Sequence, residues 1–289
     1  MASKISSLIG GTFLFISVWL PSAVAQNTSN AAKNTGYLAL GDSLAFGYNP
    51  LIQPPDLSQY VGYPEIIASA LRMSLANASC PGETSGTFAG TSMEYYPGFN
   101  CATLRANNGL FVAYNGAQTQ LDYAVAYLQA NPNPKLVTID IGGNDLGILQ
   151  ATCTANYNGN LAGILLCEET GLPGVLATFG RNLTLIYSCL RATGYAGTII
   201  AMNYYAFNYL DPVQVAAFTA LNTVIAAVST PFGVHVGNAY LAFQLATTYS
   251  RGDACAAGLL IKLQNGTCDT HPSLAGQALL AATMLTAYY

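Results

Sequence analysis

The chain has 289 residues and carries 9 basic against 13 acidic side chains, for a formal net charge of −4. Nucleic acids and anionic membranes bind clusters of Lys and Arg, so this composition argues against both as main partners. Charged residues are 8% of the sequence, against about 25% in an average globular protein, so uncharged polar side chains must supply most of the polar surface.

The first 25 residues have the features of a secretory signal peptide. Lys4 precedes an apolar run from Leu8 to Leu20, and Ala23-Val24-Ala25 matches the small-x-small pattern of a cleavage site. The alternative is a retained anchor helix, although the run is short for a membrane span. We expect a secreted protein, extracellular or periplasmic, with no stable membrane span after cleavage. Residues 26–36 then form a flexible lead-in, and residues 37–289 form one domain.

Apolar strands alternate with helices from residue 37 onwards. Strands are predicted at 37–40, 136–141, 198–202 and 233–236. Helices are predicted at about 60–75, 117–130, 175–191, 212–228 and from 273 to the C-terminus. The strands are apolar throughout, as in sheets that helices cover on both faces. The sequence therefore predicts an α/β/α sandwich on a mostly parallel central sheet.

The stretch from about Leu146 to Gly174 is rich in Asn, Gly and Leu and contains two cysteines. We interpret it as an ordered insertion that borders the crevice at the end of the sheet. A plain surface loop is the alternative, and the sequence does not separate the two.

All seven cysteines follow the signal peptide, and a secreted chain can oxidise them. None has Cys-x-x-Cys spacing, which argues against a zinc site. The sequence favours three local pairs and one buried, reduced thiol, although it does not fix the connectivity: Cys80–Cys101, Cys153–Cys167, Cys255–Cys268 and free Cys189.

Two predicted strands end in loops that carry candidate functional groups, as is usual in open parallel sheets. Gly41-Asp42-Ser43-Leu44 follows the first strand. Either Ser43 presents its hydroxyl to the crevice there, or Asp42 or Ser43 caps a helix. Gly142-Gly143-Asn144-Asp145 follows the next. The Asn144 amide there either donates to an oxyanion or belongs to an ordinary turn.

The chain contains two histidines. His235 lies within a predicted strand, which favours a structural role. His271 lies in a loop before the last helix, with the carboxylate of Asp269 two residues earlier. A serine nucleophile needs a base with a pKa near neutrality within reach, so His271 is the better candidate.

In this order, these segments resemble the GDSL/SGNH hydrolase family, whose four blocks centre on Ser, Gly, Asn and His. The matching segments are Tyr37–Leu44, Asn77–Thr84 with Gly82 as the block glycine, Gly142–Asp145 and His271-Pro272. The resemblance implies a flavodoxin-like sandwich and a serine hydrolase with Ser43 as nucleophile. It also implies an oxyanion hole formed by the Ser43 N–H, the Gly82 N–H and the Asn144 amide.

The last block departs from the family pattern, which usually has Asp three residues before His. Cys268 occupies that position here, and Asp269 lies two residues before His271. Either Asp269 or a backbone carbonyl could orient the imidazole, the latter giving a Ser–His dyad. We favour Asp269, because loss of the orienting carboxylate is costly in catalytic triads.

We therefore expect a secreted esterase or lipase that cleaves small-molecule, lipid or acylated-glycan esters as a monomer. The sequence has no Gly-x-Gly-x-x-Gly or Walker pattern, and no metal or other cofactor is expected. A polysaccharide O-deacetylase or a thioesterase would use the same site. Outside enzymes, the alternative is a non-catalytic secreted binding module.

Overall fold

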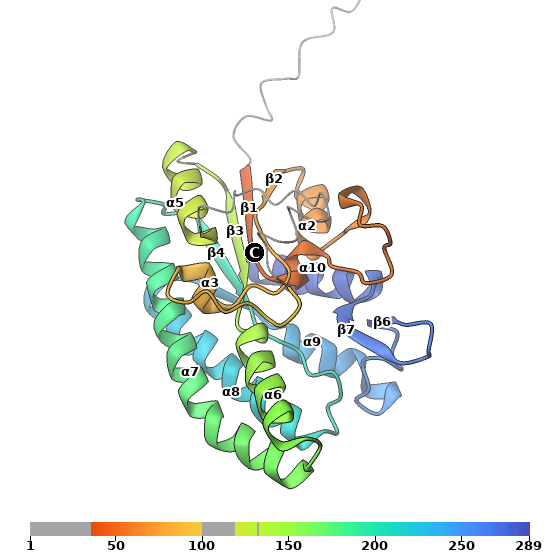
Figure 1. Ribbon diagram of the computed structural model, residues 1–289. Coiled ribbons are helices and arrows are strands. Elements are labelled where there is room, and N and C mark those ends of the chain that lie inside the picture. The colour runs from red at the N-terminus through yellow and green to blue at the C-terminus, as the bar shows by residue number, and fades with distance from the viewer. Residues whose placement is uncertain (1–35, 100–118, 132) are drawn as a thin grey trace, which may run out of the picture. The chain divides into compact units, whose positions relative to one another are not determined.

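The computed structural model describes residues 36–99, 119–131 and 133–289 (Figure 1). The expected signal peptide lies outside the described residues, as do the lead-in up to residue 35 and Cys101. The signal peptide and its cleavage therefore stay predictions.

Five parallel strands form the central sheet in the order β2-β1-β3-β4-β5. Their bounds are β1 Gly36–Gly41, β2 Ser74–Asn77, β3 Leu136–Asp140, β4 Thr198–Met202 and β5 His235–Gly237. This order is that of flavodoxin-like folds, in which ligands bind beyond the carboxyl ends of the strands near β1 and β3. The predicted α/β/α class is confirmed.

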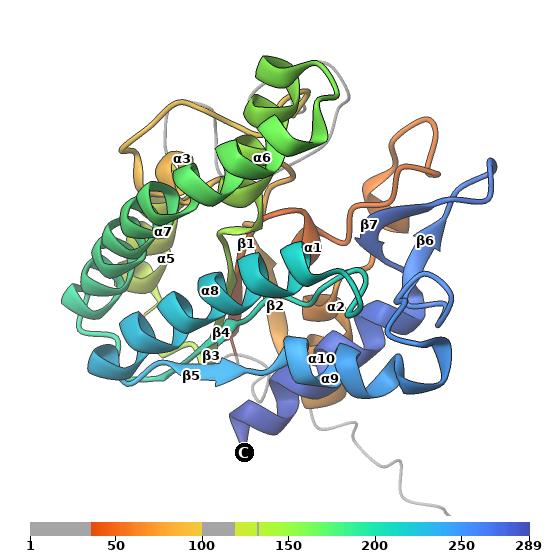
Figure 2. The same cartoon turned by 90° about the horizontal axis from the view of Figure 1, so that it is seen from below.

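Helices cover both faces of the sheet, with α5, α7 and α8 on one face and α2, α9 and α10 on the other (Figure 2). The helices are α1 Ser43–Phe46, α2 Tyr63–Leu71, α3 Ser85–Ala89, α5 Gln120–Ala130, α6 Gly143–Tyr157, α7 Leu161–Ala192, α8 Pro212–Ser229, α9 Ala239–Ala246 and α10 Leu274–Tyr288. The core lies between these layers, where β3 is buried along its whole length. Its apolar sequence follows from this double coverage.

The helix predicted at 60–75 is shorter than expected. It ends at Leu71, and Arg72 takes a left-handed conformation with φ of 52°. The chain then forms the short edge strand β2, which is only partly buried and therefore lacks the apolar pattern of the inner strands. The predicted C-terminal end of this helix, at about residue 75, was therefore wrong.

The stretch 146–174 is helical, so the surface-loop alternative is wrong. It contains most of α6 and the first part of α7, which are joined by a tight turn at 158–160. Asn158 and Gly159 have positive φ in this turn, and Asn160 caps α7 by accepting from the Gly163 N–H at 3.3 Å. The two helices form a hairpin that starts directly at the end of β3.

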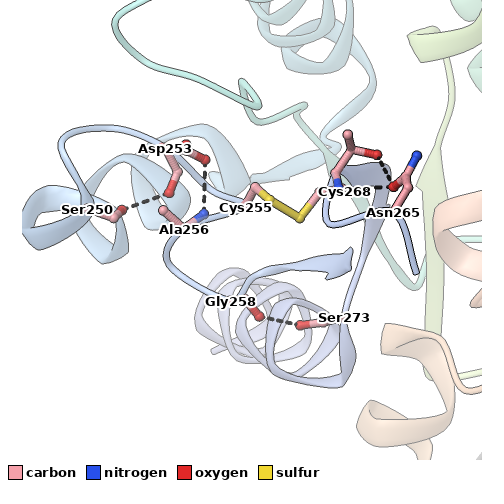
Figure 3. Close-up of a disulfide and its surroundings, with 9 residues drawn as sticks. Ser250, Asp253, Cys255, Ala256, Gly258, Asn265, Cys268 and Ser273 are labelled. Atoms are coloured by element: carbon pink, nitrogen blue, oxygen red, sulfur yellow. Dashed lines mark hydrogen bonds between the residues drawn. A yellow bond between two sulfur atoms is a disulfide. The ribbon is translucent and has the colours of Figure 1, made fainter. Parts of the chain in front are cut away.

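Two predicted disulfides are confirmed: Cys153–Cys167, which joins α6 to α7, and Cys255–Cys268 (Figure 3). Cys189 is free as expected, but it is partly exposed on α7 rather than fully buried. The Cys80–Cys101 pairing includes a residue outside the described ones and stays a prediction. Disulfides are compatible with an extracellular location.

A second small sheet was not anticipated. Strands β6 (Leu260–Lys262) and β7 (Cys268–Pro272) form an antiparallel hairpin with an irregular register. Segment 268–272 is polar and lies partly exposed, so it lacks the apolar pattern by which the other strands were recognised. This hairpin carries both Asp269 and His271.

Judged by length and composition alone, α7 and the segment Pro212–Phe232 could each cross a membrane. The most apolar part of α7 has no buried residue, whereas the second half of α7 buries Phe179 and Ile186 in the core, and α8 buries Leu221. Core helices often pass such a test, so the finding is weak evidence for a span. The expected absence of a span stays a prediction.

Replacing Cys153 and Cys167 together by Ser should lower the free energy of unfolding by about 3 kcal/mol, because the bridge closes a short loop between two helices. Urea unfolding followed by circular dichroism measures the change. The control is Cys189→Ser, which removes an unpaired thiol and should cost less than about 1 kcal/mol. Equal losses in both variants would contradict a stabilising role for the bridge.

Candidate active site

Ser43 lies at the first position of α1, directly beyond the carboxyl end of β1. Gly41 makes this turn possible, since its φ is 137° and an added Cβ would lie 2.3 Å from the Asp140 carbonyl oxygen. Asp42 caps α1 by accepting from the Leu44 N–H at 2.9 Å. The capping alternative is therefore correct for Asp42, and it leaves the Ser43 hydroxyl available.

His271 reaches Ser43 from the far end of the chain. Its Nε2 lies 2.8 Å from the Ser43 Oγ, although 228 residues separate the two. On the other side of the ring, Nδ1 is hydrogen-bonded to the Asp269 carboxylate, which also accepts from the His271 backbone N–H at 2.9 Å. The structure thus brings together Ser43, His271 and Asp269 in the order of a catalytic triad.

The Asp269 carboxylate is suited to stabilise a charged imidazole. Burial raises the pKa of this carboxyl. The hydrogen bond from His271, the charge of the protonated imidazole and the backbone N–H groups outweigh burial, so the pKa is lowered overall. Asp269 is therefore ionised at neutral pH. Asp269 thus contacts the imidazole although Cys268 stands at the position where the family usually has its Asp.

Three contacts hold the segment that carries Asp269 and His271. The Cys255–Cys268 disulfide fixes its beginning, and the Ser273 hydroxyl donates to the Gly258 carbonyl at 2.7 Å beyond its end (Figure 3). Between them, the Tyr205 hydroxyl donates to the Thr270 carbonyl at 3.0 Å. These contacts restrict the position of the imidazole relative to α1.

Gly82 lies in a segment that extends the pairing of β2 with β1. The Cys80 N–H donates to the Gly41 carbonyl at 3.0 Å, which brings this segment alongside the turn at Ser43. Gly82 has φ of 79°, and an added Cβ would lie 2.3 Å from the Phe99 Cβ, so the position favours glycine on two grounds. Among the described residues, neither the Gly82 N–H nor the Ser43 N–H has a hydrogen-bond acceptor.

Asn144 is the second residue of α6. One hydrogen of its amide is donated to the Glu83 carbonyl at 2.9 Å, which ties Asn144 to the residue after Gly82 and leaves the other hydrogen for a ligand. The structure thus places all three predicted oxyanion donors on segments around Ser43. His235, by contrast, is exposed on the edge strand β5.

Asp145 connects two of these segments, a role that the sequence did not reveal. Its carboxylate accepts from the Ser85 N–H at 2.9 Å and from the Ser85 hydroxyl at 2.5 Å, and Asn182 donates to that same hydroxyl. Burial raises the pKa of Asp145 to about 6, while the bonds from Ser85 oppose the shift. The network fixes the start of α3 relative to α6.

Gln120 was also missed. Its side chain is fully buried, with Oε1 accepting from the Gly41 N–H at 2.5 Å and Nε2 donating to the Gly41 carbonyl at 3.0 Å. It supports the turn before Ser43 from the side of α5. The only sequence signal was a polar residue at the start of a predicted helix, which is where exposed polar residues also occur.

Aromatic rings border the site. The Tyr48 ring meets the His271 ring edge-on at 4.9 Å between centroids, and Phe99 meets Tyr48 in the same way at 5.3 Å. Phe99 lies against Gly82, and Tyr96 lies against Gly147 of α6. These rings form an apolar wall that runs from the imidazole past Gly82 towards α6. Among the described residues, no group of three or more His, Cys, Asp or Glu is placed to hold a metal ion.

The flavodoxin-like sheet, with a Ser–His–Asp arrangement beyond its carboxyl edge, defines the class of SGNH-type hydrolases. The sequence profile of the GDSL-like lipase/acylhydrolase family matches residues 39–279. The chain therefore belongs to that family, and this membership supports ester hydrolysis as its activity.

Solved structures with the same fold include three hydrolases. Phospholipase A1 from Streptomyces albidoflavus NA297 is 20% identical with a TM-score of 0.58, over 89% of this chain and 100% of that one. An extracellular lipase from Streptomyces rimosus is 20% identical with a TM-score of 0.58, over 88% of this chain and 99% of that one. A variant of an acetyl-xylooligosaccharide esterase from Geobacillus stearothermophilus is 16% identical with a TM-score of 0.51, over 89% of this chain and 96% of that one. No curated protein matches the sequence significantly.

Proposed function

We propose that this protein is a secreted serine hydrolase that cleaves carboxylic esters through an acyl-enzyme on Ser43. The observation that carries the proposal is the hydrogen bond between Ser43 Oγ and His271 Nε2, with the Asp269 carboxylate on the opposite ring nitrogen. Nucleophilic acyl transfer requires this spatial order of groups: a hydroxyl, a base beside it, and a carboxylate that orients the base.

The reaction begins when His271 Nε2 takes the proton of Ser43 Oγ as this oxygen attacks the ester carbonyl. The imidazolium then gives the proton to the departing alcohol, and the acyl group remains on Ser43. In the second half, His271 removes a proton from water as the water oxygen attacks the acyl carbon. The bond to Ser43 Oγ then breaks, the imidazolium returns the proton to Oγ, and the acid is released. Asp269 keeps Nδ1 protonated and stabilises the imidazolium throughout.

The oxyanion of each tetrahedral intermediate needs donors that are fixed before the reaction. We assign this role to the Ser43 N–H, the Gly82 N–H and the Asn144 amide. The first two are free among the described residues, and the third is oriented by Glu83. One well-aimed donor lowers the free-energy barrier of the rate-limiting step by about 3 kcal/mol. The convergence of all three makes a non-catalytic binding module the weaker alternative.

We favour esters with an apolar acyl chain over acetylated glycans and thioesters. The wall formed by Tyr48, Phe99 and Tyr96 offers apolar surface beside His271 and Gly82. In addition, the α6–α7 hairpin exposes Leu161 and Leu166 to solvent. Secretion is supported by the signal-peptide pattern and is compatible with the disulfides.

A fluorophosphonate probe should label the wild-type protein covalently and should leave Ser43→Ala unlabelled, because the reagent requires an activated serine oxygen. Mass spectrometry of the labelled peptide measures the result. Ser69→Ala serves as the control, since Ser69 is exposed on α2, and it should stay labelled. Labelling of folded Ser43→Ala would contradict the assignment of the nucleophile.

Asp269→Asn should lower kcat about a thousandfold and change KM little, because an amide no longer fixes the tautomer of His271 or stabilises its charge. Steady-state kinetics on a soluble ester measures both constants. Asp253 and Asp269 both line a pocket of about 210 Å³, so Asp253→Asn is the control. The new amide keeps the oxygen that accepts from the Ala256 N–H. A near-normal kcat in Asp269→Asn would instead favour the Ser–His dyad.

Across p-nitrophenyl esters from acetate to palmitate, kcat/KM should rise with chain length and reach at least about tenfold above acetate, as partial burial of methylenes contributes about 0.8 kcal/mol each at most. Phe99→Ala should reduce this gain and leave acetate turnover similar. Tyr249→Ala, at a fully exposed ring, is the control. A maximum at acetate would favour a deacetylase over a lipase.

A further inference from the structure

Two buried carboxyl groups lie directly beneath the nucleophile and take no part in the mechanism above. Asp42 is 2% exposed and Asp140 is 0% exposed. The Asp42 N–H donates to the Asp140 carbonyl at 3.1 Å and lies 3.4 Å from the Asp140 Oδ2. Each carboxyl group shifts the pKa of the other, so the two groups interact directly.

The oxygens of the pair also accept hydrogen bonds from neighbouring donors. The Tyr63 hydroxyl donates to Asp140 Oδ1 at 2.7 Å, and the Tyr204 hydroxyl donates to Asp42 Oδ2 at 2.6 Å. The Leu44 N–H occupies Asp42 Oδ1. Among the described residues, no Lys or Arg is bonded to either carboxyl, so no fixed positive charge balances two negative ones at this place.

Two ionised carboxylates in contact within a buried site repel each other strongly, whereas one shared proton turns the contact into a strong hydrogen bond. Burial raises the pKa of both groups. For Asp140, the charge of Asp42 raises the pKa further, to well above its usual range. For Asp42, the bonds from Asp140, Leu44 and Tyr204 oppose the rise.

We propose that Asp42 and Asp140 form a proton-sharing carboxyl pair, in which Asp140 holds the proton at neutral pH and donates it to the Asp42 carboxylate. The pair is a positioning device. Asp42 caps α1 and precedes Ser43, whereas Asp140 ends β3 shortly before Asn144. The shared proton therefore ties the strand end that carries the nucleophile to the strand end that carries an oxyanion donor.

The other titratable groups facing the pair are consistent with one proton. Tyr37 and Tyr205 are buried phenols near Asp140, and burial raises the pKa of both well above its usual range, so neither supplies a charge. His271 lies on the Asp42 side, where the imidazolium that forms during the reaction favours an ionised Asp42. Glu65 is hydrogen-bonded to Asn77, and Asp145 is bonded to Ser85.

Infrared spectroscopy tests the proton directly, through the C=O stretch of a protonated carboxylic acid, which ionised carboxylates lack. At about pH 8, about two units above the pKa of about 6 for Asp145, wild type should retain one such band. Asp140→Asn should lose it. Asp145→Asn makes the same change at another carboxyl near Ser43 and should keep the band.

Kinetics tests the positioning role with two variants of similar size. Asp140→Leu removes the proton donor and should lower kcat at least about tenfold, with a smaller effect on KM, because a bond to a buried charge is lost. Asp140→Asn replaces the shared proton by an amide N–H that points at Asp42 and should restore kcat to within about threefold of wild type. Circular dichroism establishes that both variants fold.

The pH dependence of stability gives a third readout. The folded-state pKa of Asp140 is raised, so its contribution is complete below the unfolded value of about 3.9 and declines as the pH rises towards the folded value. The Tm of wild type should therefore fall relative to that of Asp140→Asn between about pH 5 and pH 8. A constant difference across this range would overturn the proposal.

A wild-type spectrum without the acid band at about pH 8 would also overturn it, as would a band that persists in Asp140→Asn. A variant Asp140→Asn as impaired as Asp140→Leu would show that the carboxyl acts through something other than its proton. The infrared and stability readouts do not depend on Ser43 being the nucleophile. Failure of the pair is therefore distinguishable from failure of the proposed function.

Discussion

The close approach of β1 and β3 at Gly41 is the constraint on which the site depends. An added Cβ at Gly41 would overlap the carbonyl oxygen and the carboxyl of Asp140, so the two strand ends meet only because this position carries no side chain. Gln120 completes the turn from the opposite side by bonding both polar atoms of the Gly41 backbone. Ser43 and Asn144 thus emerge close together from neighbouring strands, with little freedom to separate.

The base is held differently, because it does not come from the main sheet. His271 lies at the end of the β6–β7 hairpin, whose short ladder would not by itself fix a side chain. The Cys255–Cys268 bridge and the bond from Tyr205 to the Thr270 carbonyl replace the missing sheet contacts. A covalent tie is useful at this place, since the hairpin has only two short strands.

The sequence predicted the inner strands and the three site loops well, because buried parallel strands are apolar throughout and end where functional groups collect. It missed β2 and the β6–β7 hairpin, whose strands are short and partly exposed. It favoured Asp269 as the group that orients His271 but left a backbone carbonyl as the alternative, because the bond requires the backbone of the hairpin to turn the carboxylate back onto the ring. Contacts across long separations, such as Gln120 with Gly41, leave no local pattern.

Charge balance links the carboxyl pair to the chemistry. In the transition state for acylation, the imidazolium carries one positive charge, while Asp269 and the oxyanion each carry a negative one. An ionised Asp42 lies on the same side as His271 and adds to the stabilisation of the imidazolium. A second ionised carboxylate at Asp140 would oppose the forming oxyanion without facing the imidazole, and in a buried site that repulsion is weakly screened. A shared proton keeps the attraction of Asp42 for His271, removes the charge that would oppose the intermediate, and leaves the contact between β1 and β3 intact.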